Sequence, residues 1–272
     1  MSKAAAFLAP ALALTAALLQ GATSGDDNFN IKLWEPGKVP LATAEGPLDQ
    51  PFLTVFLPPE KKRNGSAVVV APGGGNIMLM YGVEGIEIAE RFNEWGTTAF
   101  VLTYRLAPKY REDARVLDGN RAMRLVRSRA QEFKIDPDRI AFAGFSAGSS
   151  MARSVAAAAT AGDPNAADPV DRYNSKPSAL VMVYGPGRPT PTEKLKEFPP
   201  TFLLAAAGDQ GAANGSAQFF LELNKAGAVA ELHLYQRGRH GFGAATTSPE
   251  FGPWMDELNH FLKLNHFFEA RK

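Results

Sequence analysis

The chain has 272 residues, enough for one large domain or two small ones, and its hydrophobic fraction of 45% and charged fraction of 21% are ordinary for a globular protein. The 29 Lys and Arg residues nearly balance the 28 Asp and Glu residues, and this formal net charge of +1 gives no electrostatic basis for binding nucleic acid or an anionic membrane. Cysteine is absent, which excludes disulfides, a cysteine nucleophile and a thiolate zinc site.

The first 24 residues differ in composition from the rest of the chain. A lysine near the start precedes an apolar run over residues 4–19, and small residues follow at 22–24. This layout is typical of a secretory signal peptide, and the run is short for a membrane span. The sequence therefore predicts a signal peptide over residues 1–24, one domain over residues 25–272, a secreted or periplasmic location, and no membrane contact after cleavage.

The remaining chain alternates between strand-like and helix-like patterns. Residues 52–59 alternate in hydropathy and end in Pro-Pro, which predicts an early edge strand. Residues 66–76 form an apolar run that ends in glycines, as in a strand buried on both faces. The further predicted strands are residues 97–106, 140–145, 179–185, 201–208 and 230–236, and the predicted helices are residues 82–96, 113–133, 147–160, 216–227 and 252–272.

Strands that alternate with helices predict a single α/β domain with a mostly parallel central sheet and helices on both faces. No internal repeat or linker divides this body. The segment between the strands at 179–185 and 201–208 is too short for a large lid, so we expect a minimal one. Such sheets bind ligands at the carboxyl ends of their strands, and functional residues are therefore expected directly after strands.

The stretch Gly144-Phe145-Ser146-Ala147-Gly148 fits the pattern G-x-S-x-G between a predicted strand and a predicted helix. In such a turn the glycines avoid steric clashes and the serine is held outward in a strained conformation. The helix start favours negative charge, and the Ala147 N–H is placed to bind an oxyanion. The alternative is a small residue at a crowded turn, but the strand–turn–helix context favours a nucleophile.

A serine nucleophile needs a base, and the chain has only four histidines. His240 lies in a glycine-flanked loop after the last predicted strand, where it can reach the nucleophile. His233 lies inside a strand, and His260 and His266 lie in the last helix, which favours packing or solvent exposure for these three. The sequence therefore predicts His240 as the base.

An acid should orient the imidazole and stabilise its cation. Asp209 directly follows a buried predicted strand, and the chain order Ser146, Asp209, His240 is that of an alpha/beta-hydrolase triad. The other acidic candidates, none of which follows a late strand, are Asp118, Asp163, Asp168 and Asp256.

Three glycines, Gly73 to Gly75, follow the first buried strand. The backbone N–H groups of Gly74 and Gly75 are predicted to form an oxyanion hole together with that of Ala147. The glycines could instead cradle a phosphate, but the Lys-Ser/Thr ending of a P-loop and the spaced G-x-G-x-x-G of a dinucleotide fold are both missing. Acyl transfer explains them better, and it requires no metal and no organic cofactor.

With these residues placed, the sequence resembles the alpha/beta-hydrolase esterases that act on plant cell-wall polysaccharide, the acetyl xylan esterase and feruloyl esterase-like group. The resemblance covers nearly the whole chain after the leader, including "VVVAPGGGN", "FVLTYRLAPKYR" and "ELHLYQRGRHGFG". It implies that Ser146 is the nucleophile, Asp209 the acid and His240 the base, with the oxyanion loop at residues 73–75. The chain departs from the group at residues 149–151 and 212–213, which bears on substrate preference.

The expected function is a serine carboxylesterase that removes short acyl groups, acetyl above all, from carbohydrate such as acetylated xylan. Its partners would be an acylated carbohydrate or a small ester. Two other enzyme readings stay open: a general short-chain carboxylesterase, and a serine peptidase of the prolyl-oligopeptidase kind, which the absence of propeller-like repeats disfavours. From another class, a non-catalytic carbohydrate-binding protein on a hydrolase fold is disfavoured by the retention of all three triad residue types.

Overall fold

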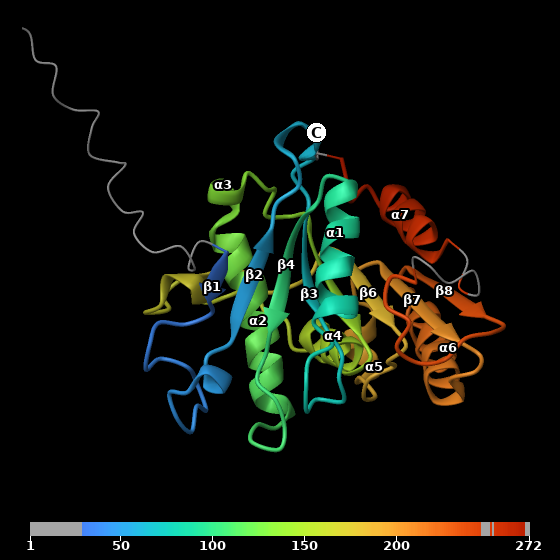
Figure 1. Ribbon diagram of the computed structural model, residues 1–272, viewed down its shortest axis with the longest axis horizontal. Coiled ribbons are helices and arrows are strands. Elements are labelled where there is room, and N and C mark those ends of the chain that lie inside the picture. The colour runs from blue at the N-terminus through green and yellow to red at the C-terminus, as the bar shows by residue number, and fades with distance from the viewer. Residues whose placement is uncertain (1–28, 246–250, 252, 270–272) are drawn as a thin grey trace, which may run out of the picture.

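A computed structural model describes residues 29–245, 251 and 253–269 of the chain. The expected signal peptide, residues 1–24, lies outside the described residues. An eight-stranded sheet in the order β1-β2-β4-β3-β5-β6-β7-β8 forms the centre of the molecule (Figure 1). The strands are β1 (Asn30–Lys32), β2 (Phe52–Phe56), β3 (Ala67–Ala71), β4 (Thr98–Thr103), β5 (Ile140–Phe145), β6 (Leu180–Val183), β7 (Thr201–Ala206) and β8 (Ala230–Tyr235).

The sheet is mostly parallel, as predicted. Strands β4, β3, β5, β6, β7 and β8 pair in parallel, whereas β1 and β2 pair antiparallel with their neighbours. The prediction that the segment 52–59 is an edge strand is wrong, because β1 covers the outer side of β2. With only three residues, β1 is too short to give a periodic signal in the sequence.

Each predicted helix forms, with shifted ends, and the short helix α5 was not predicted. The helices of the described residues are α1 (Glu87–Glu94), α2 (Glu112–Ser128), α3 (Ala130–Phe133), α4 (Ala147–Ala157), α5 (Thr192–Leu195), α6 (Gln210–Lys225) and α7 (Trp254–Leu264). The predicted helix 82–96 starts with a π-helical turn, Gly82–Ile86, before it continues as α1. The predicted helix 113–133 is interrupted at Arg129, which divides it into α2 and α3.

Helices cover both faces of the sheet. Buried side chains of α1 and α7 pack on one face, and those of α2, α4 and α6 pack on the other; α1 and α7 lie in front of the sheet in Figure 1. Strand β3 supplies both layers, because Val68 and Val70 point to the first face and Val69 to the second. Each fully buried valine of this kind stabilises the fold by about 1.5–3 kcal/mol.

Two further features bear on access to the strand ends. Between β6 and β7 the chain forms only the one-turn helix α5, which agrees with the expectation of a minimal lid. Among the helices of the described part, none is long and apolar enough to cross a membrane.

Candidate active site

Ser146 occupies a sharp turn at the carboxyl end of β5. The strand ends at Phe145 and α4 begins at Ala147, so Ser146 alone makes the turn, with φ of 52° and ψ of −114°. This is a strained conformation for a residue other than glycine. The flanking glycines are required by close approach, since a Cβ on Gly144 would lie 2.1 Å from the Gly148 oxygen, and one on Gly148 would lie 2.0 Å from the Ala71 oxygen.

The three residues predicted as nucleophile, base and acid lie together. The Oγ of Ser146 is 2.6 Å from Nε2 of His240, and Nδ1 of His240 makes a short hydrogen bond with Oδ2 of Asp209. Since an ionised carboxylate can only accept, Nδ1 carries the proton and Nε2 is free to accept the serine hydroxyl. The His240 side chain is 50% exposed, so a ligand can reach this hydrogen-bonded chain from solvent.

Asp209 is held by the helix that follows it. It is the N-cap of α6, and its Oδ1 accepts a hydrogen bond of 3.2 Å from the Ala212 amide. The second oxygen remains for His240. One carboxylate thus fixes the start of a helix and the orientation of the imidazole at the same time.

The rival residues have other partners. Asp118 receives a two-pronged contact from the buried Arg105, with Oδ1 2.7 Å from Nη2, and Asp168 pairs with Arg121 at 2.6 Å. His233 contacts Glu231 at 2.6 Å. Within the described ranges no hydrogen bond joins Ser146 to the other rivals, which are Asp163, Asp256, His260 and His266.

The glycine loop after β3 runs directly against the serine turn. A Cβ on Gly73 would lie 2.7 Å from the Cβ of Ser146. The Gly74 carbonyl accepts the amides of Ile77 and Met78 at 3.2 Å each, which folds the loop back on itself. Among the described residues, the amides of Gly74, Gly75 and Ala147 donate to no protein group, as an oxyanion site requires.

A buried carboxylate, which was not predicted from the sequence, supports this loop. Glu84, in the π-helical turn, is 2% exposed, and its Oε2 accepts the Gly73 amide at 2.7 Å. Its Oε1 accepts the Tyr184 hydroxyl at 2.6 Å, and that hydroxyl oxygen in turn accepts the Gly243 amide at 3.0 Å. Glu84 and Tyr184 therefore connect the glycine loop with the loop that carries His240.

Tyr184 also contacts the histidine itself. It directly follows β6 and has a φ of 41°, a strained value for an aromatic residue. Its ring lies 4.9 Å from the His240 ring and 4.6 Å from the Phe242 ring. Burial, together with the Glu84 charge, raises the pKa of Tyr184 well above its usual value, so the hydroxyl stays protonated as a donor. Its place at a strand end was the one signal that could have drawn attention to it.

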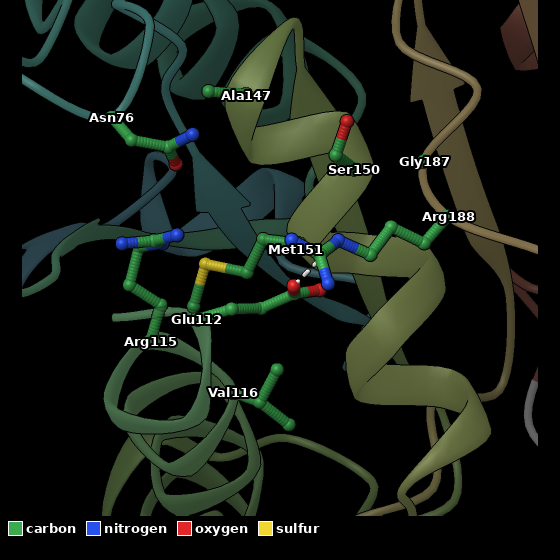
Figure 2. A pocket seen from close by; sticks show the side chains of 9 residues that line it. All are labelled: Asn76, Glu112, Arg115, Val116, Ala147, Ser150, Met151, Gly187 and Arg188. Carbon is green, nitrogen blue, oxygen red and sulfur yellow. Dashed lines mark ion pairs between the residues drawn. The ribbon is translucent and has the colours of Figure 1, made fainter. Parts of the chain in front are cut away.

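A cavity of about 270 Å³ adjoins the start of α4 (Figure 2). Its wall includes Ala147, next to the serine, together with the polar side chains of Asn76, Ser150 and Arg115. Within the part of the chain that the structure describes, no three His, Asp or Glu side chains gather in an arrangement that could hold a metal ion.

Taken together, the fold and the hydrogen-bonded chain have the layout of a serine hydrolase. The chain belongs to the alpha/beta hydrolase fold family, whose model matches residues 68–194. This confirms the fold predicted from the sequence.

Among known proteins, the chain is similar to an acetylxylan esterase of Xylanibacter ruminicola, with 27% identity over 231 residues, 78% of this chain and 48% of that protein. It therefore spans about half the length of this curated relative. Among solved structures, it is similar to an acetyl ester-xyloside bifunctional hydrolase of Caldicellulosiruptor lactoaceticus, with 30% identity, a TM-score of 0.80, and 88% of this chain and 96% of that chain covered.

A third similar protein, esterase 2 of Thermogutta terrifontis with propionate bound, has a TM-score of 0.67 and 20% identity, and 82% of this chain and 92% of that chain are covered. At that identity it shows the fold alone. The names of the first two relatives agree with the resemblance found in the sequence, and they support a carboxylic ester hydrolase.

Proposed function

We propose that the protein is a serine carboxylesterase that removes short acyl groups, acetyl in the first place, from carbohydrate such as acetylated xylan. The observation that carries the reaction type is the hydrogen-bonded chain from Ser146 through His240 to Asp209. The substrate class is supported by the names of two relatives, an acetylxylan esterase and an acetyl ester-xyloside hydrolase.

In the first half of the reaction, Nε2 of His240 takes the hydroxyl proton of Ser146 as Oγ attacks the ester carbonyl carbon. The Asp209 carboxylate stabilises the imidazolium that forms. The carbonyl oxygen becomes an oxyanion and accepts hydrogen bonds from the amides of Gly74, Gly75 and Ala147. Loss of one such donor typically costs about 3 kcal/mol of transition-state stabilisation.

In the second half, the imidazolium of His240 gives its proton to the departing alcohol oxygen, and the acyl group remains bonded to Ser146. His240 then takes a proton from a water molecule, whose oxygen attacks the acyl carbon. The Ser146 oxygen leaves with the proton from His240, and the carboxylic acid is released. The half-exposed position of His240 allows that water to reach the site.

The proposal includes export. The leader over residues 1–24 has the composition of a signal peptide, and its removal would leave the protein secreted or periplasmic. Amino-terminal sequencing of the protein recovered outside the cytoplasm tests this: a mature chain that begins near residue 25 supports it, and an intact leader contradicts it.

Acetate release from acetylated xylan, measured beside hydrolysis of 4-nitrophenyl acetate, tests the function. We expect both activities in the wild type and neither in Ser146→Ala, with unchanged thermal unfolding of that variant. Activity on the nitrophenyl ester alone would retain the mechanism and favour a general short-chain carboxylesterase. Near-normal activity in Ser146→Ala would refute the assignment of the nucleophile, and inactivity of the wild type on both would favour a carbohydrate-binding protein.

A further inference from the structure

The cavity beside Ala147 is larger and more charged than an acetyl group requires. Its volume is about 270 Å³, and residues of α2, α4 and the segment before α5 line it. Because Ala147 belongs both to this wall and to the proposed oxyanion hole, a ligand bonded to Ser146 can extend into the cavity. The cavity therefore lies within reach of the same reaction.

Three charged side chains line the cavity, and two of them neutralise each other. Glu112 pairs with Arg188 at 2.8 Å and also accepts the Ser154 hydroxyl at 3.0 Å. Figure 2 shows this pair beside Met151, with the Arg188 guanidinium against the Glu112 carboxylate. The charges of Glu112 and Arg188 therefore cancel each other.

Arg115 is the third, and it has no carboxylate partner among the described residues. Its Nη1 donates to the Tyr110 carbonyl at 3.0 Å, and the nearby Asp118 is already bonded to Arg105. Figure 2 shows the Arg115 guanidinium rising from α2 toward Asn76, on the other side of the cavity from Arg188. A half-buried guanidinium that makes no ion pair with the described residues gains by meeting an anion, and its planar fork fits a carboxylate.

We propose that this cavity is a subsite for a carboxylate on the substrate, bound by Arg115 with Asn76 and Ser150 as polar neighbours. The inference rests on the proposed esterase function and narrows its substrate class to esters that carry a negative charge. The carboxylate can belong to the sugar side, as in an acidic sugar next to the acylated one, or to the acyl side, as in a half-ester of a dicarboxylic acid.

Three aryl esters distinguish a carboxylate on the alcohol (sugar) side of the ester from a carboxylate on the acyl side. 4-Nitrophenyl acetate is uncharged, 4-acetoxybenzoate carries a carboxylate on the departing alcohol, and 4-nitrophenyl hydrogen succinate carries one on the acyl group. For the charged ester that uses the subsite, Arg115→Gln should lower kcat/KM roughly tenfold more than it does for 4-nitrophenyl acetate, mainly through KM. Equal losses on all three esters in Arg115→Gln would overturn the proposal.

Two further variants test whether the preference for a charged ester depends on the charge inside the cavity and on the position of Arg115. Glu112→Gln removes the negative charge and frees Arg188, so it should raise the preference for the charged ester. Arg124→Gln removes a cation from the same helix outside this cavity and should leave the preference of the wild type unchanged. If Arg115→Gln and Arg124→Gln changed this preference equally, the preference would depend on the total charge of the protein. That result would also overturn the proposal.

Binding without turnover separates failure of the subsite from failure of the function. Calorimetry with the Ser146→Ala protein and the two charged esters should show binding that the added Arg115→Gln change weakens. If the wild type hydrolyses no ester but this binding is seen, the function fails and the subsite stands. If the wild type is an esterase and neither charged ester binds better than 4-nitrophenyl acetate, the subsite fails alone.

Discussion

Glu84 is a carboxylate buried beside the nucleophile with hydrogen-bond donors in place of a cation. Its two oxygens accept the Gly73 amide and the Tyr184 hydroxyl, and no salt bridge to it occurs in the described part of the chain. A buried charge held only by donors is costly, and such groups gather where loops must be fixed for function. The strained φ of Tyr184 and the π-helical turn around Glu84 belong to the same network.

Replacement of Glu84 by Gln tests this network at the level of one residue. Gln has an NH2 group in place of one carboxylate oxygen, so in the same position this group would face either the Gly73 amide or the Tyr184 hydroxyl, both of which donate to Glu84. We expect a loss of about 1–3 kcal/mol in the free energy of unfolding and a fall in kcat of roughly tenfold with a smaller change in KM. Steady-state kinetics on 4-nitrophenyl acetate and thermal unfolding measure both quantities.

Glu87→Gln is the matched control, since Glu87 lies on the adjoining helix with its side chain exposed. It should change neither quantity. An unchanged kcat in Glu84→Gln, with or without loss of stability, would show that the network does not position the catalytic groups.

Among the helices and strands, α6 is linked to the candidate site through its own N-cap residue. The helix starts at Gln210 because Asp209 caps it, and the same carboxylate holds His240. Asn and Asp are equally good N-caps, but Asn has an NH2 donor in place of the second oxygen that His240 needs, and it carries no charge to stabilise the imidazolium.

Asp209→Asn should therefore separate the two roles of this carboxylate. We expect kcat to fall by roughly 10⁴-fold while the unfolding temperature stays near that of the wild type. Asp209→Ala should lose the same activity and, in addition, about 1 kcal/mol of stability from the lost cap. Substantial activity in Asp209→Asn would mean that another group orients His240.

The sequence predicted the elements that carry the proposed chemistry because Ser146 and Asp209 follow strands that are apolar on both faces, and His240 lies in the loop after the last strand, which is only partly buried. Ser146, Asp209 and His240 follow β5, β7 and β8, and two hydrogen bonds connect them. Glu84 could not be predicted, because it lies inside a helical pattern and its partner Tyr184 is 100 residues away. Arg115 gave no signal either, since a cation on an amphipathic helix is usually solvated.

At the scale of the whole molecule, the Asp49 side chain links the antiparallel edge of the sheet to its parallel part. Asp49, just before β2, contacts Lys109 at 2.5 Å, the hydroxyl of Tyr110, and the Gly46 amide at 3.0 Å. Lys109 and Tyr110 follow β4, so the contact joins two segments distant in sequence. The hydrogen bonds from Lys109 and Tyr110 lower the pKa of Asp49 below its ordinary value of 3.8.

This shift predicts a pH-dependent contribution to stability. Because the pKa is lower in the folded protein than in the unfolded chain, the contribution is complete above pH 3.8 and is lost as the pH falls through the folded pKa. Asp49→Asn should therefore unfold at a lower temperature than the wild type near pH 7, and the difference should shrink below pH 4. Glu45→Gln, an exposed neighbour, should show no such difference at any pH, and a constant deficit in Asp49→Asn would contradict the prediction.

The strand order means that the central sheet can pair only late during synthesis of the chain. Strand β4 lies between β2 and β3, although both precede it in the sequence, and β5 lies on the other side of β3. As the chain leaves the ribosome, β2 and β3 thus have no neighbour on their inner sides until residues beyond 98 are made. Late closure of the sheet keeps the nascent chain open for longer, and the export proposed above would need such an open chain to pass through a translocation channel.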